Sequence, residues 1–119
     1  MEIDIRKQDG VSVLVISGRM GIDGGDAILR ETFQGLLDSG ERYFVFDLRR
    51  ISGLDSAGLG EIIACHKRVA RLDGGVRLVM DRPGRIHDFF ATAHLDRVFT
   101  LFETVEQSVE SYASDPVSH

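Results

Sequence analysis

The sequence predicts one α/β domain built on a largely parallel sheet. Strand-like segments alternate with helical patterns several turns long, which is the order expected when crossover helices join parallel strands. Two of the strand-like segments, VSVLVIS and YFVFDL, are apolar at nearly every position, as in strands that are covered on both faces. The length of 119 residues suits a single domain with a sizeable core.

The N-terminal part of the chain is expected to form a β-hairpin and then a helix. Residues 3–6 and 11–17 have the composition of strands and flank a turn-like segment at residues 8–10. The glycine-dense segment 18–25 is expected to be a loop. A helix then extends to about Ser39. Its apolar residues recur at helical spacing, at Leu29, Phe33, Leu36 and Leu37.

Residues 43–48 are predicted to form the central strand, and residues 57–72 the helix that follows it. The apolar face of this helix is expected to comprise Leu59, Ile62, Ile63, His66 and Ala70. Its charged residues, Glu61 among them, are expected to lie mostly on the other faces. On an apolar face, a histidine such as His66 is more naturally a hydrogen-bonded core residue than a catalytic base.

The C-terminal part is expected to add a strand, a short helix, an edge strand and a last helix. The two strands are placed at residues 76–80 and 98–101, and residues 81–84 form a turn after the first of them. The short helix has apolar residues on one face, at Ile86, Phe89, Phe90 and Ala93. The last helix starts at Thr104, and its apolar residues are Val105, Val109 and Tyr112.

Composition excludes several classes of function. A formal net charge of −5 argues against a nucleic-acid footprint and against electrostatic binding to anionic lipid. Cys65 is the single cysteine, so no internal disulfide forms. No apolar run has the length of a secretion signal or a membrane span, which predicts a cytoplasmic protein without membrane insertion. Residues 114–119 are expected to be a flexible tail, which leaves residues 1–113 as the domain.

The stretch ISGLDSAGLG, residues 51–60, connects the central strand to its helix and is the best candidate for a functional loop. A hydrolase nucleophile at Ser56 is disfavoured, because the elbow G-x-S-x-G requires glycine where Leu54 stands. The glycines of GRMGIDGGD lack the spacing and the lysine of a phosphate-binding loop. His87 and His94 have no third ligand at a recognisable spacing and are expected at the surface. No catalytic residue, metal or cofactor is therefore expected.

Ser56 is predicted to cap the helix, since serine is among the preferred N-cap residues. Capping does not explain why the small residues Ala57, Gly58 and Gly60 follow it. Two glycines in a first turn each cost about 1 kcal/mol relative to alanine. The sequence therefore indicates a turn that is kept bare so that another surface approaches Ser56.

The motif Asp55-Ser-Ala-Gly-Leu-Gly60, after an apolar strand that ends in Asp47-Leu48, resembles the signature of STAS-domain anti-sigma-factor antagonists. In that family an Asp-Ser-[Ser/Ala/Thr]-Gly-Leu-Gly turn connects the central strand to a helix. The resemblance extends over most of the chain, through the segments VSVLVISGRM, LDSGERYFVFDL, RLDGGVRLV and IHDFFATAHLDRVFTLFETVEQSV. It implies a single STAS domain: a four- to five-stranded mixed sheet with about four helices mainly on one face.

The resemblance also implies a function by partner switching, without catalysis by this chain. The unphosphorylated antagonist binds an anti-sigma factor that is also an ATP-binding serine kinase, and so frees the sigma factor. The kinase phosphorylates the serine after the motif aspartate, here Ser56, which disrupts the complex, and a PP2C-type phosphatase restores it. The residues implied in partner binding are Asp55, Ala57, Gly58, Leu59, Gly60 and Asp23.

Several alternatives stay open. Asp55 either orients the Ser56 hydroxyl, contacts the kinase, or assists the helix cap. Where family members often have the acidic Gly-Glu-Leu-Asp, this chain has Gly18-Arg-Met-Gly21, so the charge beside the partner surface differs. A STAS subunit of a phospholipid ABC transporter is the second reading, in which the same turn docks an ATPase subunit without being phosphorylated. A nucleotide-binding STAS domain is the third, and a weak homodimer is left open.

Overall fold

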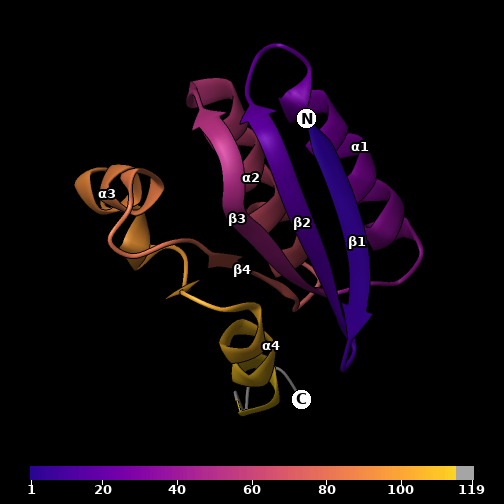
Figure 1. Ribbon diagram of the computed structural model, residues 1–119. Helices are drawn as coiled ribbons and strands as arrows, with labels where there is room; N and C mark the ends of the chain where they lie inside the picture. Colours follow the sequence, from indigo (N-terminus) through magenta and orange to yellow (C-terminus); the bar gives the residue numbers. More distant parts are fainter. Residues whose placement is uncertain (115–119) are drawn as a thin grey trace.

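The computed structural model describes residues 1–114 and shows a five-stranded mixed sheet with four α-helices (Figure 1). The strands lie in the sheet in their order along the chain: β1 (Glu2–Gln8), β2 (Val11–Met20), β3 (Tyr43–Leu54), β4 (Gly75–Val79) and β5 (Leu101–Phe102). β1 pairs antiparallel with β2, and each later pair of neighbours is parallel. The predicted α/β fold, with a hairpin at one edge and YFVFDL in the central strand, is confirmed.

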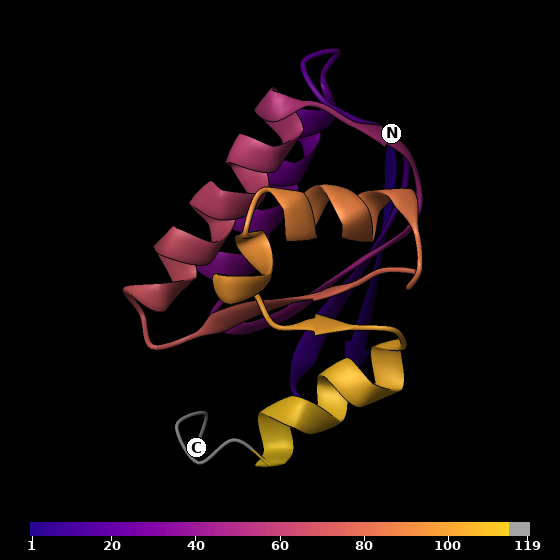
Figure 2. The same cartoon turned by 90° about the vertical axis from the view of Figure 1, so that its left-hand side faces the viewer.

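Three helices pack on one face of the sheet and the fourth on the other. α1 (Gly25–Asp38), α2 (Ser56–Ala70) and α3 (Arg85–Thr92) enclose the larger core, while α4 (Val105–Ser114) covers a smaller one. Figure 2 shows α2 and α4 on opposite sides of the sheet. The smaller core consists of Val11, Val13, Val45, Val79, Val109 and Tyr112. This burial on two faces explains why the central strands are apolar at nearly every position.

β2 and β3 are both longer than predicted, so the loops that carry the candidate site are shorter. Residues 18–20 and 51–54, which the sequence assigned to loops, pair with each other as the ends of these parallel strands. Strand pairing satisfies the backbone N–H and C=O groups of both segments, and this outweighs their glycine content. The two strands therefore deliver their last residues to the same edge of the sheet.

The predicted edge strand at residues 98–101 is displaced in the structure. A 3₁₀ turn at Leu95–Arg97 precedes it, and β5 comprises only Leu101–Phe102. The predicted tail begins at Ser114, which is the last residue of α4, and residues 115–119 lie outside the described part of the chain. Within residues 1–114, no helix combines the length and the apolar content needed to cross a membrane.

The buried face of α2 differs from the predicted one at Glu61, which is buried, and at Ala70, which is exposed, and His66 lacks an expected hydrogen bond. Glu61 is 7% exposed, and its carboxylate lies 3.2 Å from Arg68 and 3.6 Å from Arg30 of α1, so it is buried as an ion pair. The His66 ring packs on Phe99 with centroids 5.0 Å apart, and burial lowers the pKa of the imidazole. No described residue hydrogen-bonds its Nδ1, so the predicted hydrogen-bonded histidine is wrong at this atom.

Candidate functional site

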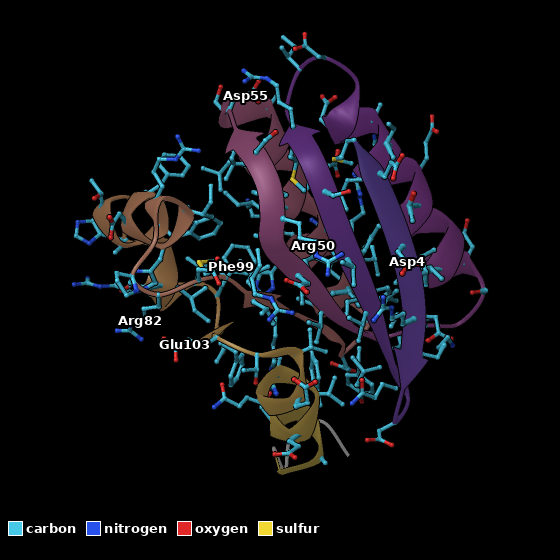
Figure 3. All side chains as sticks on the ribbon, in the orientation of Figure 1. Asp4, Arg50, Asp55, Arg82, Phe99 and Glu103 are labelled. Carbon is cyan, nitrogen blue, oxygen red and sulfur yellow. The ribbon has the colours of Figure 1, made fainter. Side chains whose placement is uncertain are left out.

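The candidate site lies at the edge of the sheet where β2 and β3 end. The loop 21–24, between β2 and α1, stands next to the turn that connects β3 to α2. Figure 3 shows Asp55 at this edge, where the arrows of β2 and β3 point. Loops at the carboxyl ends of parallel strands are the usual location of functional groups in α/β domains.

The Asp55 carboxylate ties the two loops together. Its Oδ1 accepts hydrogen bonds from the backbone N–H of Ala57 (2.9 Å) and of Gly58 (3.0 Å), and its Oδ2 accepts one from the N–H of Ile22 (3.0 Å). Asp55 has extended backbone angles and is the N-cap of α2. The prediction that Ser56 is the N-cap is therefore wrong. Of the roles considered for Asp55, the structure shows the one at the helix cap.

These hydrogen bonds hold the Asp55 pKa below its ordinary value. The bond from the Ile22 N–H contributes most, followed by those from Gly58 and Ala57, and the nearby Arg19 guanidinium acts in the same direction. All of them favour the charged carboxylate over the neutral acid. Asp55 is consequently an anion at neutral pH, directly beside Ser56.

Ser56 is the first residue of α2 and is exposed to solvent, as expected for a residue at this rim. Its neighbour Asp55 uses both carboxylate oxygens on backbone amides, and no described residue forms a hydrogen bond with the Ser56 hydroxyl. The hydroxyl is therefore available to an incoming enzyme or partner.

The two glycines of the first turn serve different purposes. Gly58 is buried, and a Cβ at this position would lie 2.3 Å from the Met20 carbonyl oxygen at the end of β2. Gly58 is therefore required by packing, which corrects the prediction that the whole turn is bare for the sake of a partner. Gly60 is exposed and has open space around it. Packing within the domain therefore requires a glycine at position 58 but not at position 60.

The remaining residues implied in partner binding differ in accessibility. Asp23 is exposed, and its carboxylate lies 3.6 Å from the Arg19 Nε. Ala57 is half-buried, and Leu59 is half-buried against the larger core. The set therefore differs in exposure: Ser56, Gly60 and Asp23 are exposed, and Gly58 is buried.

Ile22 is a residue of this edge that the sequence analysis did not single out. Its side chain is 75% exposed, although it is a large apolar residue. The signal was present in the sequence, because an isoleucine between the glycines of a polar loop has no place in a core pattern. His94 is exposed, as predicted, whereas the His87 side chain is only 16% exposed, so the predicted surface position is wrong for His87. Among residues 1–114 no three metal-ligating side chains come together.

We expect the stability contributed by Asp55 to depend on pH. Because its pKa is lowered in the folded protein, the contribution is present above the ordinary carboxyl pKa and is lost as the pH falls through the folded-state value. Asp55→Ala should therefore be less stable than wild type at neutral pH, and the difference should shrink towards about pH 3. Urea unfolding of both proteins across this range measures it.

The control is Asp38→Ala, which removes a surface carboxylate that accepts a hydrogen bond from Gln34 one helical turn away. This variant should stay close to wild type at neutral pH. A stability difference for Asp55→Ala that is the same at neutral and acidic pH would contradict the role assigned to the charged carboxylate.

Comparison with known proteins gives a consistent result for this fold. A family model described as the STAS domain matches residues 2–108. A Thermotoga neapolitana protein that is provisionally named an anti-sigma factor antagonist is 22% identical over 102 residues, which cover 86% of this chain and 89% of the relative. An anti-sigma factor antagonist from Mycobacterium paratuberculosis has a crystal structure that superposes with a TM-score of 0.80 at 22% identity, covering 92% of each chain.

The Bacillus cell fate determinant SpoIIAA, solved in its phosphorylated form, superposes with a TM-score of 0.71 at 15% identity. The match covers 92% of this chain and 98% of SpoIIAA. At these identities, the likeness to the solved structures establishes a common fold.

Proposed function

The chain belongs to the STAS domain family, and from this premise we propose that it is an anti-sigma-factor antagonist that acts by partner switching. In its unmodified form it binds an anti-sigma factor that is also a serine kinase, and the sigma factor is released. Phosphorylation of Ser56 ends this interaction, and a PP2C-type phosphatase renews it. The chain itself contributes no catalysis, only a surface and an acceptor hydroxyl.

The observation that carries the proposal is the state of Ser56. The residue is exposed at a sheet edge, its hydroxyl has no partner among the described residues, and the backbone around it is fixed by the Asp55 carboxylate. A kinase needs an accessible hydroxyl, and a partner protein needs a surface that does not have to be ordered on binding. Both requirements are met at the same residue.

The relatives support the same proposal. Two of the proteins that this chain resembles are named as anti-sigma factor antagonists, and a third, SpoIIAA, has been solved in a phosphorylated form. We propose that the partner contacts the accessible residues of the site. Ser56, Gly60 and Asp23 are exposed, and Asp55, Ala57 and Leu59 are half-buried. Gly58 supports this surface from inside.

The test is phosphorylation by the candidate anti-sigma factor with ATP, followed by mass spectrometry. We expect a single phosphate on Ser56 in the wild type and none in Ser56→Ala. Because alanine adds no bulk or charge at an exposed position, Ser56→Ala should still bind the kinase with nearly the wild-type Kd. A phosphate on another residue, or binding to a transporter ATPase subunit in place of any anti-sigma factor, would refute the proposal.

A further inference from the structure

We propose that Ile22 is the apolar anchor by which the anti-sigma-factor partner docks beside Ser56, so that the partner carries an apolar pocket for this side chain. The inference rests on the proposed function and extends it by naming a contact residue outside the motif. Six large apolar side chains are exposed among the described residues: Ile5, Ile22, Ile28, Leu72, Phe89 and Val98. Ile22 is the most exposed of them, at 75%.

The loop that carries Ile22 is held rigidly. The Ile22 N–H donates to Asp55 Oδ2 at 3.0 Å, and the Asp26 N–H donates across the loop to the Gly21 carbonyl at 3.0 Å. A Cβ at Gly21 would lie 2.2 Å from Asp55 Oδ2, and one at Gly25 would lie 2.7 Å from the Arg19 carbonyl, so both positions fit closely against their neighbours. The loop is thus ordered before any partner arrives, which reduces the entropy lost on binding.

The position of Ile22 relative to Ser56 follows from Asp55. The same carboxylate binds the Ile22 amide on one side and caps the helix that begins at Ser56 on the other. The Ile22 backbone therefore lies beside the turn that carries Ser56, within reach of a protein surface that covers Ser56. Because Ile22 has no core to enter, its side chain stays in water unless a partner buries it, and this burial contributes to binding.

The charges around Ile22 indicate what kind of pocket fits it. Arg19 and Asp23, on either side in the sequence, lie 3.6 Å apart at Nε and Oδ2 and compensate each other. The uncompensated charge next to Ile22 is therefore that of the Asp55 carboxylate, and both of its oxygens are already held by backbone amides. A pocket lined by apolar residues suits this neighbourhood better than a strongly basic one.

The experiment compares the Kd of wild type, Ile22→Ala and Ile22→Val for the purified serine kinase that phosphorylates Ser56 in the test above, by isothermal titration calorimetry. We expect Ile22→Ala to raise Kd by at least about tenfold, because the contact area of a buried isoleucine is lost. Ile22→Val, which keeps most of the apolar surface, should remain within about fivefold of wild type. Thermal unfolding should be unchanged in both, since the side chain is exposed.

Leu72→Ala is the matched control, because Leu72 is an exposed apolar residue, 46% accessible, in the turn after the opposite end of α2. Its Kd should equal that of wild type. A wild-type Kd for Ile22→Ala overturns the anchor and leaves the proposed function intact. If wild type self-associates in sedimentation experiments and Ile22→Ala does not, Ile22 contacts a second copy of this chain and not the kinase, and the proposed anchor is overturned. If no kinase acts on Ser56, the proposed function fails, and the inference with it.

Discussion

Phosphorylation of Ser56 is expected to weaken binding to the anti-sigma factor by about a hundredfold to a thousandfold, which corresponds to about 3 to 4 kcal/mol. The phosphate adds about −1.5 to −2 charges and three acceptor oxygens to an exposed residue. A partner surface that accepts a bare hydroxyl has neither space nor positive charge for this group.

The structure gives a reason why the helix itself does not neutralise the phosphate. A helix N-terminus ordinarily offers free N–H groups and a positive dipole end to an anion. Here the amides of Ala57 and Gly58 already bind the Asp55 carboxylate, and the amide of Leu59 binds the Asp55 carbonyl. Because Asp55 is charged and adjacent, few donors or positive charges within the domain offset the charge of the phosphate, which then faces the partner.

Titration of the kinase with phosphorylated and unmodified protein measures this effect, with a non-hydrolysable ATP analogue present so that the unmodified sample stays unmodified. Ser56→Ala controls for the loss of the hydroxyl, and Ser56→Asp should show a smaller loss of affinity than the phosphate because it adds a single charge. If the phosphorylated protein binds within threefold of the unmodified one, modification of Ser56 does not control the complex.

The α/β sheet, its hairpin edge, its central strand and the exposure of Ser56 were predictable because they depend on local patterns. The doubly apolar strands, the hairpin signal and the alternation with helices are each visible within short windows of sequence. The position of Ser56 at the carboxyl end of the central strand follows from that order without any knowledge of packing.

The internal structure of the site was not predictable in the same way. Asp55 and Ser56 are equally good N-cap residues on sequence grounds, and the choice between them involves the Ile22 amide, 33 residues away. Likewise, the reason for Gly58 is the carbonyl of Met20 on a neighbouring strand. Both facts are tertiary contacts between loops whose lengths were themselves uncertain, because β2 and β3 run further than their composition suggests.

The substitution Gly58→Ala is expected to destabilise the fold by about 2 to 3 kcal/mol. A Cβ at Gly58 would lie 2.3 Å from the Met20 carbonyl oxygen and 2.8 Å from its carbon, and these are backbone atoms of a buried strand end. Neither can rotate away, so α2 or the end of β2 has to move. The Asp55 hydrogen bonds to Ala57 and Gly58 would be disturbed by either movement.

Gly60→Ala, the same substitution two residues later, provides the matched comparison. Apart from the adjacent backbone of α2, no atom lies within 4 Å of a Cβ placed there, and alanine is about 1 kcal/mol more favourable than glycine inside a helix. Gly60→Ala should therefore raise the midpoint of thermal unfolding by a few degrees, while Gly58→Ala lowers it by about 8 °C or more. Scanning calorimetry of the two variants distinguishes them directly.

The pair also separates packing from recognition. If Gly60 is kept small so that the partner approaches Ser56, Gly60→Ala should bind the kinase more weakly than wild type although its fold is more stable. A Gly60→Ala variant that is both more stable and equally tight in binding would show that the bare surface has no part in docking. Equal stability losses at Gly58 and Gly60 would instead contradict the packing of α2 against the end of β2, on which the geometry of the whole site depends.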